Sequence, residues 1–503
     1  LVIVCTTIIV ESRKASSSLD ENESEIRERF LRPKTYRVAD YEEEIAPWHL
    51  YEDAAAEARS QPLHLARNAD NPVRIYDYEP DAPSFNYLPM EHTIHQQRAR
   101  QEPRGDGTSY WYTGLFHHTD TDERAPTVLG PERPTTTTAT SNVPSNAVTV
   151  AVYYYPWYHT DFHGRKYIRG ELQPPQMPVL GEYNDRSSKV LARHLEWSRQ
   201  ANVNLWVTSW WGPDSETDIT TSNYIFKHRD LRDMKLCLLY ETMGRVDVET
   251  NNTNRVYNDI AYAAETYFNH PNYHRIDGRP VMFVYLTRTL ERRELLKDVL
   301  SKMRTAAFKK GHLLYIVGDH TYGSPPETKL KALDWLDAVT NYDIFGSMGR
   351  PDGFAKRKRV NKYSREQAAW KRAANAQGCA YIPGATPGYN DKAVRQGDYN
   401  AMSRKLNKQQ GYGSLFRILL RQGRKLVDSK TNNLLIVNSF NEWHEDTQIE
   451  PVVEGGATVL PWFLTRGRVY RGYGELYLNI LRRETTRRSP RKRSSNLNAT
   501  INL

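Results

Sequence analysis

Short apolar runs alternate with longer amphipathic stretches from about residue 147 onwards. The runs are rich in Val, Ile and Leu. Their length and branching are typical of strands that are buried on both faces, as in parallel sheets under helices. We expect eight strands, at residues 148–154, 205–209, 236–240, 281–285, 313–317, 338–340, 380–383 and 434–438.

The stretches between these runs are long enough for helices. In 187–202, for example, Leu191, Leu195 and Trp197 recur near helical spacing. Alternating strands and helices imply parallel pairing through right-handed crossovers, and eight units close into a (β/α)8 TIM barrel, an α/β fold. An open doubly wound sheet is the alternative, but no glycine-rich phosphate loop follows the first strand. Further helices are expected at 254–268, 289–309, 365–377 and 415–428.

The residues before the barrel are polar and irregular. Residues 15–146 are rich in Glu, Arg, Asp, Pro and Thr, and we interpret them as a stem or linker of low order. The run PTTTTAT at 134–140 resembles an O-glycosylated spacer, so we place the domain boundary just after it. The predicted barrel domain is 147–481, and a basic disordered tail follows at 482–503.

The first ten residues, LVIVCTTIIV, are largely apolar, but crossing a bilayer takes about 20. Since the first residue is not methionine, we interpret residues 1–14 as the remnant of a signal anchor or signal peptide; a short apolar strand is the alternative. Sequons at Asn22, Asn251 and Asn498 agree with a secretory route. We expect attachment to a membrane of the Golgi or another secretory compartment, with a lumenal catalytic domain, or secretion as the alternative.

The net charge of +9 is unevenly distributed along the 503 residues. Between Arg482 and Arg493, seven basic residues and one glutamate give +6, so the remainder carries only +3. We interpret this tail as a solvated end and expect a monomer without a nucleic-acid partner. Cys5, Cys237 and Cys379 are too few and too scattered for a disulfide framework or a zinc cluster, and the last two are expected to be small core residues.

Carboxylates and aromatic residues follow the predicted strands, at the end of a parallel barrel that carries active sites. The last apolar run leads to Glu442 and Glu445, which form a candidate catalytic pair. Rings that receive sugar C–H faces, together with polar groups that bind hydroxyls, are typical of carbohydrate sites. The other residues expected at this mouth are Tyr154, Trp157, Trp210, Trp211, Tyr240, Glu241, Tyr285, Asp319, His320, Tyr389 and His444.

Two acids beside a glycosidic bond are the usual equipment for hydrolysis. One is protonated to assist the leaving oxygen, and the other is ionised. His444 lies between the two glutamates, but the helical His-Glu-x-x-His pattern is absent and no second histidine is near it in the sequence. We therefore expect His444 to form hydrogen bonds, and we expect neither a metal nor another cofactor.

Six sequence elements occur in order through the predicted barrel. They are YYYPWY at 153–158, LARHLEWSRQANV at 191–203, SWWGP at 209–213, HPNYHRIDGRPVMFVY at 270–285, PGYND with Arg395 beyond it, and SFNEWHEDTQIEP at 439–451. Together they resemble glycoside hydrolase family 99, the endo-α-1,2-mannosidases and endo-α-1,2-mannanases. The resemblance includes neither the stem nor the basic tail.

The resemblance implies a (β/α)8 barrel that cuts internal α-1,2-mannosidic bonds of N-glycans or α-mannan with retention and without a metal. It implies that Glu445 is the general acid and base. Glu442 would deprotonate the 2-hydroxyl of the sugar, whose oxygen then attacks C1 to give a 1,2-anhydro sugar. Tyr285, Arg395 and Trp211 match positions that contact substrate in the family, and Asn441 is expected in the same site. Tryptophan at 211 is similar to the bacterial mannan-acting enzymes and favours mannose in the adjoining subsite.

The chain departs from the family pattern at two places. Asp446 follows Glu445 where the family usually has glycine. We expect Asp446 to keep the left-handed turn and, as a third carboxylate, to raise the pKa of Glu445 or alter the leaving-group subsite. After the third strand the family has Glu-Pro-Tyr, but this chain has Glu241, Thr242 and Met243, so a tyrosine that contacts substrate is expected to be missing.

Two other functions remain open on the sequence. Some bacterial barrel proteins called glycosyltransferases share the Asn-Glu-Trp element, so a polysaccharide-assembly protein is one alternative. A catalytically inactive glycan-binding protein is the other, although the presence of both Glu442 and Glu445 argues against it.

Overall fold

The structure is a computed structural model, and it describes residues 148–486 with the exception of 160, 249 and 396–399. The predicted signal remnant, the stem and the last part of the tail lie outside the described residues. Helix α16 (Leu476–Thr486) continues past residue 482, with Leu481 and Glu484 buried. The ordered domain therefore extends beyond the boundary that we predicted at 481, because α16 packs against α14 and α6.

All eight apolar runs form strands of one parallel sheet, at or close to the predicted positions. β6 differs most, since it starts two residues later than predicted and so includes Asp319. The strands are β1 (Thr149–Tyr154), β2 (Leu205–Trp210), β3 (Lys235–Tyr240), β5 (Arg279–Val284), β6 (Tyr315–Asp319), β7 (Ala338–Thr340), β8 (Ala380–Ile382) and β10 (Leu434–Val437).

The sheet closes through the segment that contains Pro383. On one side of this proline, β8 pairs with β7. On the other side, β9 (Gly384–Ala385) pairs with β10, which in turn pairs with β1. Since every pairing around this ring is parallel, the predicted (β/α)8 barrel is confirmed. A short strand, β4 (Arg275–Ile276), adds an antiparallel hairpin outside the ring.

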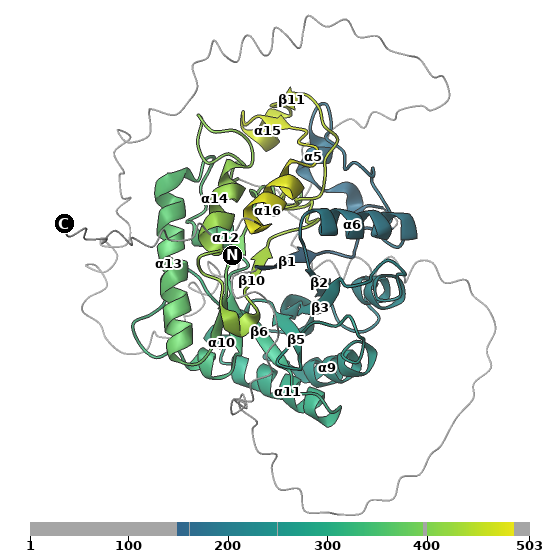
Figure 1. Ribbon diagram of the computed structural model, residues 1–503, viewed down its shortest axis with the longest axis vertical. Coiled ribbons are helices and arrows are strands. Elements are labelled where there is room, and N and C mark those ends of the chain that lie inside the picture. Colours follow the sequence, from purple (N-terminus) through teal and green to yellow (C-terminus); the bar gives the residue numbers. More distant parts are fainter. Residues whose placement is uncertain (1–147, 160, 249, 396–399, 487–503) are drawn as a thin grey trace, which may run out of the picture. The chain divides into compact units, whose positions relative to one another are not determined.

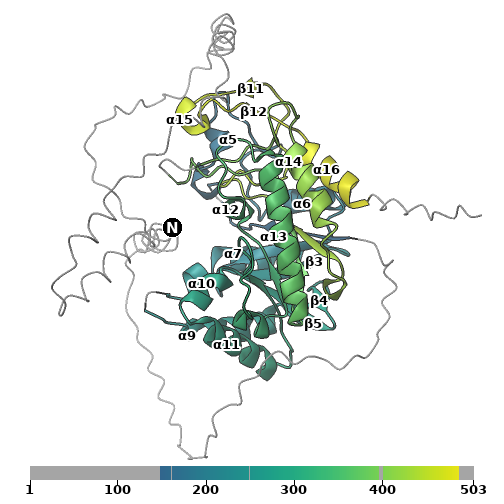
Figure 2. The same cartoon turned by 90° about the vertical axis from the view of Figure 1, so that its left-hand side faces the viewer.

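Helices surround the strands (Figure 1). The predicted helix at 289–309 is divided into α10 and α11, because Glu294 takes a left-handed backbone conformation with φ of 60°. Figure 2 shows the long helix α13 beside α14, with α16 next to α14. The longer helices are α6 (Ser188–Gln200), α9 (Asn254–Thr266), α10 (Thr287–Arg292), α11 (Leu296–Lys309), α13 (Lys356–Ala376) and α14 (Ser414–Gly423).

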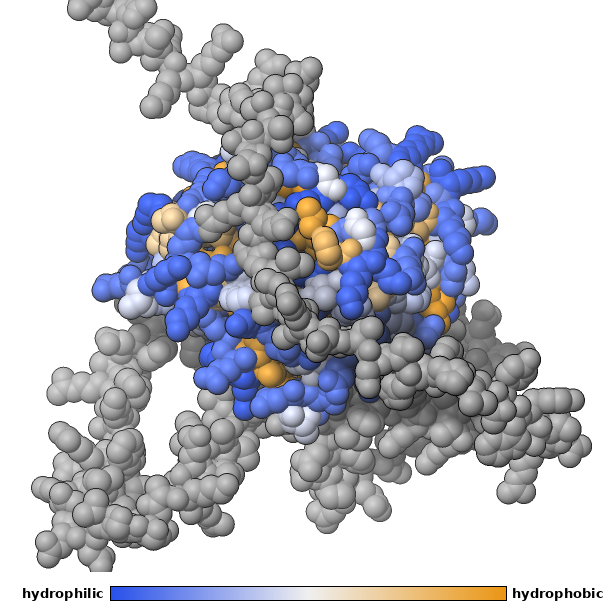
Figure 3. Space-filling view, turned by 90° about the horizontal axis from the view of Figure 1, so that it is seen from below, coloured by the Kyte–Doolittle hydropathy of each residue, from blue (hydrophilic) through white to orange (hydrophobic). Residues whose placement is uncertain are grey.

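Several short elements connect or extend these units. The hairpin of β11 (Ala457–Thr458) and β12 (Tyr470–Arg471) lies after the last barrel strand and precedes α16. Seen from the end where α9 and α11 lie in Figure 1, the described surface is mostly hydrophilic, with small and separate hydrophobic areas (Figure 3). The short helices are α5 (Ile168–Glu171), α7 (Glu216–Thr220), α8 (Thr242–Arg245), α12 (Ile344–Ser347) and α15 (Trp462–Thr465).

Alternate residues of each strand face the barrel interior and the surrounding helices. In β1, the ring of Tyr153 meets Phe283 of β5 inside the barrel. Its neighbour Tyr154 is bonded instead to His194 of α6, outside the barrel. Cys237 and Cys379 are free and buried, which confirms that both are small core residues.

Candidate active site

The loop after β10 carries both candidate acids, and hydrogen bonds fix it to the loop after β1. The amide of Asn441 accepts a hydrogen bond from the backbone N–H of Tyr155 at 2.8 Å and donates one to the carbonyl of Tyr155 at 2.9 Å. The hydroxyl of Ser439 accepts from the N–H of Glu442 at 2.8 Å. The indole of Trp443 donates to the buried carboxylate of Glu450 at 2.8 Å. Asn441 therefore positions the loop through both the oxygen and the nitrogen of its amide.

Glu442 is buried and bonded to His444. Its Oε1 accepts from the backbone N–H of His444 at 2.9 Å and lies 3.0 Å from Nδ1 of the same residue. Burial raises the pKa of Glu442 to about 8 against the hydrogen bond from His444 and the charge of Arg395. Burial also lowers the pKa of His444 to about 4, so the imidazole is neutral near pH 7. The prediction that His444 forms hydrogen bonds is confirmed.

Glu445 is partly buried beside Arg395, with 15% of its side chain exposed. Nη1 of Arg395 donates to Oε1 of Glu445 at 2.9 Å, and it lies 2.8 Å from Oδ2 of Asp391 and 3.1 Å from the hydroxyl of Tyr389. Burial raises the pKa of Glu445 to about 7; Arg395 opposes this shift, while Glu442 and Asp391 add to it. Near pH 7 Glu445 is therefore about half protonated and Glu442 mostly protonated, so both pKa values lie in the range where acid and base catalysis operate.

Two further carboxyl groups from the predicted set face the barrel interior. Glu241 accepts from the hydroxyl of Ser209 at 2.7 Å. Burial raises its pKa to about 8, and the charges of Glu442 and Glu445 contribute to the same shift. Asp319 accepts from the backbone N–H of Tyr342 at 3.0 Å, and burial raises its pKa as well. The acids thus lie close enough to influence one another's protonation.

Aromatic side chains line the same region. Trp157 stacks on His163 with a centroid distance of 4.7 Å and contacts Tyr155 at 4.8 Å. Tyr285 contacts the ring of Tyr342 at 5.0 Å. Among the described residues, the indole N–H groups of Trp157 and Trp211 are buried without a hydrogen-bond partner. Since buried donors are nearly always paired, these two N–H groups are candidates for bonds to ligand hydroxyls.

Four residues that we expected at the mouth lie elsewhere. Tyr154, Trp210, Tyr240 and His320 are buried between the sheet and the helices. Their polar atoms are engaged there, with His194, Asp218, Asp259 and Glu291 respectively. The correction follows from strand geometry, because each of the four is adjacent in sequence to a residue that faces inward. The strand ends were predicted correctly, but these four side chains face the helices and not the barrel interior.

Three residues of the site were not singled out as substrate-binding residues from the sequence. The hydroxyls of Tyr155 and Tyr342 are hydrogen-bonded to each other, and the charges of Glu442 and Glu445 act on both phenols. Asp391 holds Arg395 in place. Strict alternation along β1 would have selected Tyr155 rather than Tyr154. For Asp391, the available signal was that it belongs to the PGYND element.

Asp446 does not lie with the two glutamates. Its backbone has φ of 48°, which confirms the expected left-handed turn. Its carboxylate accepts from Nε of Arg169 at 2.7 Å and from Nη2 of Arg404 at 3.1 Å, on the far side of the loop. Both arginines hold the pKa of Asp446 below its ordinary value despite burial. Asp446 is not among the main influences on the pKa of Glu445, and the acids that raise this pKa are Glu442 and Asp391.

The segment after β3 also differs from the family pattern in structure. The hydroxyl of Thr242 donates to the carbonyl of Tyr285 at 2.8 Å, and the side chain of Met243 is 49% exposed. Met243 has no polar atom with which to replace a tyrosine hydroxyl.

Within the described residues, no group of three or more His, Cys, Asp or Glu side chains is placed to hold a metal ion.

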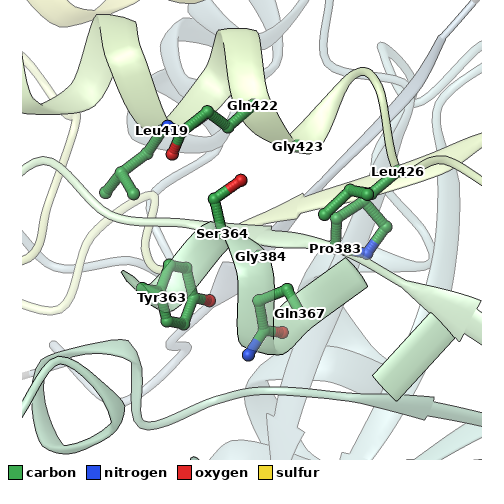
Figure 4. Close-up of a pocket in the computed structure, with 9 residues that line it drawn as sticks. All are labelled: Tyr363, Ser364, Gln367, Pro383, Gly384, Leu419, Gln422, Gly423 and Leu426. Atoms are coloured by element: carbon green, nitrogen blue, oxygen red, sulfur yellow. The ribbon is translucent and has the colours of Figure 1, made fainter. Parts of the chain in front are cut away.

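A separate small cavity lies between α13, α14 and the segment at Pro383 (Figure 4). Its polar lining includes Ser364, Gln367 and Gln422, and it contains no carboxylate. This cavity lacks the acid pair that glycoside hydrolysis needs. The candidate active site is therefore the group of acids and rings at the carboxyl ends of the barrel strands.

Comparison with known proteins decides the family. The sequence model of Glycosyl hydrolase family 99 matches residues 146–458. The chain belongs to glycosyl hydrolase family 99. It is accordingly a glycoside hydrolase, and the match covers the part of the chain that forms the barrel and both candidate acids.

Relatives of this family 99 chain include mammalian proteins. The glycoprotein endo-alpha-1,2-mannosidase of Rattus norvegicus is 24% identical over 379 residues, which cover 66% of this chain and 73% of the relative. The protein of the same name from Mus musculus is 24% identical, over 60% of this chain and 67% of the relative. A solved endo-alpha-mannosidase from Bacteroides thetaiotaomicron aligns with a TM-score of 0.47 and 20% identity, over 67% of this chain and 95% of that one.

Proposed function

We propose that this family 99 chain is a retaining, endo-acting α-1,2-mannosidase that hydrolyses internal α-mannosidic bonds of N-glycans or α-mannan. The observation that carries the proposal is the pair of glutamates, the buried Glu442 and the partly buried Glu445, at one end of a closed barrel where Trp157, Trp211 and Tyr285 follow strands β1, β2 and β5. The names of the mammalian relatives support the same bond type.

In this proposal Glu445 protonates the leaving oxygen. Its carboxyl is partly buried beside Arg395, and its raised pKa keeps a proton available near neutral pH. Glu442 removes the proton of the substrate 2-hydroxyl, whose oxygen attacks C1 and forms a 1,2-anhydro sugar. Glu445, now ionised, takes a proton from water, whose oxygen attacks C1 and opens this ring, while Glu442 returns its proton to the 2-oxygen. Retention results from two successive inversions. The reaction requires one carboxyl protonated and the other ionised, so kcat/KM should follow a bell-shaped pH profile that is set by the pKa values of both acids.

The remaining predicted residues bind the substrate in this scheme. The unpaired N–H groups of Trp157 and Trp211 supply donors for sugar hydroxyls, and their rings supply apolar faces. Glu241 and Asp319 present polar oxygens from the barrel interior, and Tyr389 holds Arg395 against Glu445. A mannose in the subsite beside Trp211 is the preferred ligand.

We also propose a lumenal location, with membrane attachment through the N-terminal segment and a monomeric catalytic domain. The apolar run at residues 1–10 motivates this and lies outside the described residues. No helix of the described residues is both long and apolar enough to cross a bilayer. The exposed sequon residue Asn251 gives a test, since lumenal chains should carry a glycan there that an Asn251→Gln variant lacks.

The activity is tested with a 1,2-linked α-mannoside oligosaccharide. The wild-type chain should release a disaccharide or longer fragment, and proton NMR should show the α-anomer first. Glu445→Gln and Glu442→Gln should each lower kcat by at least about 10²-fold, since general acid or base assistance typically contributes 10²- to 10⁴-fold. Full activity in both variants, a requirement for a nucleotide-sugar donor, or binding without turnover by the wild type would refute the proposal.

A further inference from the structure

Asp446 is the centre of a buried ionic cluster that consists of Asp446, Arg169 and Arg404. All three side chains are almost completely buried. Arg404 also donates from Nη2 to the backbone carbonyl of Asp446 at 2.8 Å and from Nη1 to the carbonyl of Gln448 at 3.0 Å. The ring of Tyr473 packs on both guanidinium groups, at 4.8 Å from Arg169 and 5.0 Å from Arg404. The cluster is thus bound to the loop by both side-chain and backbone contacts.

The cluster connects the acid loop to the segment that carries Arg395. The backbone groups of Tyr389 and Met402 exchange hydrogen bonds at 3.0 and 2.8 Å, so these two positions lie side by side. Arg395 belongs to the loop between them, and Arg404 follows directly after. The same segment therefore contacts Glu445 through Arg395 and Asp446 through Arg404.

A backbone contact strengthens this connection. The N–H of Asn390 donates to the carbonyl of Glu445 at 2.7 Å. Three attachments therefore join the two segments: the Arg395 contact and the Asn390 bond at Glu445, and the ionic cluster at Asp446. Without the cluster, the position of Glu445 against Arg395 would depend on one backbone bond and on an arginine side chain that is 39% exposed.

We propose that Asp446 is a positioning residue, which fixes Glu445 against Arg395 by binding Arg169 and Arg404 on the opposite side of the loop. This inference rests on the proposed function, because it assigns Asp446 a role in the protonation of Glu445. Asp446 itself touches neither the substrate nor the reacting atoms. A neutral side chain at 446 leaves two buried guanidinium groups facing each other without a counter-ion, which moves the loop.

The test uses Asp446→Asn in the full chain. Asparagine keeps the size of the side chain and tolerates the left-handed backbone, so the variant removes mainly the charge. We expect kcat to fall by roughly 10- to 100-fold, since a misplacement of about 1 Å has effects of this size. We expect KM to change by less than about threefold, and the bell of kcat/KM to move to higher pH, because Arg395 lowers the pKa of Glu445 and its contact is weakened.

Glu484→Gln provides a matched control. Glu484 of α16 is also a buried carboxylate bound by two arginines, Arg417 and Arg421 of α14, but it belongs to the helical layer. Its two arginines are 41% and 51% exposed, so this variant should lose less thermal stability than Asp446→Asn, and it should show no change in kcat or in the pH profile. A second control combines Asp446→Asn with Arg395→Met. If Asp446 acts through the Arg395 contact, the two losses should be much less than additive.

The outcomes separate the two proposals. If the wild-type chain does not hydrolyse the oligosaccharide, the proposed function fails. If the wild type is active and Asp446→Asn retains its kcat and pH profile, or if its loss adds fully to that of Arg395→Met, the positioning role fails. Should Asp446→Asn not fold, Arg404→Lys takes its place, since lysine keeps the charge but cannot span Asp446 and Gln448. An unchanged pH profile in Arg404→Lys then overturns the role.

Discussion

Arg395 donates a hydrogen bond from Nη1 to Oε1 of Glu445 over 2.9 Å, and the same nitrogen lies 2.8 Å from Oδ2 of Asp391. The positive charge opposes the rise in the pKa of Glu445 that burial causes, and it acts on Glu442 in the same direction. Arg395 therefore favours the ionised form of both candidate acids. Its position on a loop far from β10 in sequence means that only folding creates this relationship.

The pH profile of kcat/KM should report this effect. With pKa values of about 7 and 8 for Glu445 and Glu442, the wild-type maximum is expected between these values. Arg395→Met removes a charge that lowers both pKa values, so the whole bell should move to higher pH. Arg395→Lys keeps the charge and should move it less. A bell that stays in place in Arg395→Met would show that the guanidinium does not govern the protonation of the pair.

Two tryptophans with different positions give a second prediction. Trp157→Phe keeps an aromatic face but loses the unpaired indole N–H, so KM should rise by roughly three- to tenfold, as for one lost hydrogen bond of about 1 kcal/mol. Trp210→Phe loses the 2.7 Å bond to Asp218 in the helical layer. It should lower the free energy of unfolding by about 1–3 kcal/mol with KM unchanged. Initial rates give KM and urea denaturation gives the free energy of unfolding, so together they distinguish the two variants. If KM changed in Trp210→Phe and not in Trp157→Phe, the placement of Trp157 in the site and of Trp210 in the helical layer would be contradicted.

The buried acids predict an unusual dependence of stability on pH. Glu241 and Glu442 have pKa values of about 8 in the folded chain, against 4.5 when exposed. Between these values the folded state binds more protons than the unfolded state, so the free energy of unfolding falls as pH rises, by at most about 1.4 kcal/mol per pH unit for each group. Urea denaturation should therefore show a more stable protein at pH 5 than at pH 8.

Glu241→Gln isolates one of these groups, since glutamine cannot ionise but can still accept the bond from Ser209. The fall in the free energy of unfolding between pH 5 and 8 should become shallower in this variant, by up to about 1.4 kcal/mol per pH unit. An identical slope in the wild type and in Glu241→Gln would mean that Glu241 is already ionised in the folded chain.

Much of the barrel is determined by local sequence. Apolar runs such as 434–438 are long and branched enough to specify a buried strand, and Leu191, Leu195 and Trp197 specify the buried face of α6. Eight repeats of this pattern allow only a few topologies, because parallel strands need right-handed crossovers. The sequence also determined where the acid pair lies. The two glutamates directly follow a barrel strand, and residues at the carboxyl ends of barrel strands lie on the face that carries active sites.

Only the tertiary structure decided which side chains join Glu442 and Glu445. Neighbouring strand residues such as Tyr154 and Tyr155 face opposite sides of the sheet, and a shift of one position exchanges the site for the helical layer. The role of Asp446 was also hidden, because its partners Arg169 and Arg404 lie 277 and 42 residues away in sequence. Periodicity reports the local backbone, whereas the pairing of buried charges depends on distances that exist only after the chain has folded.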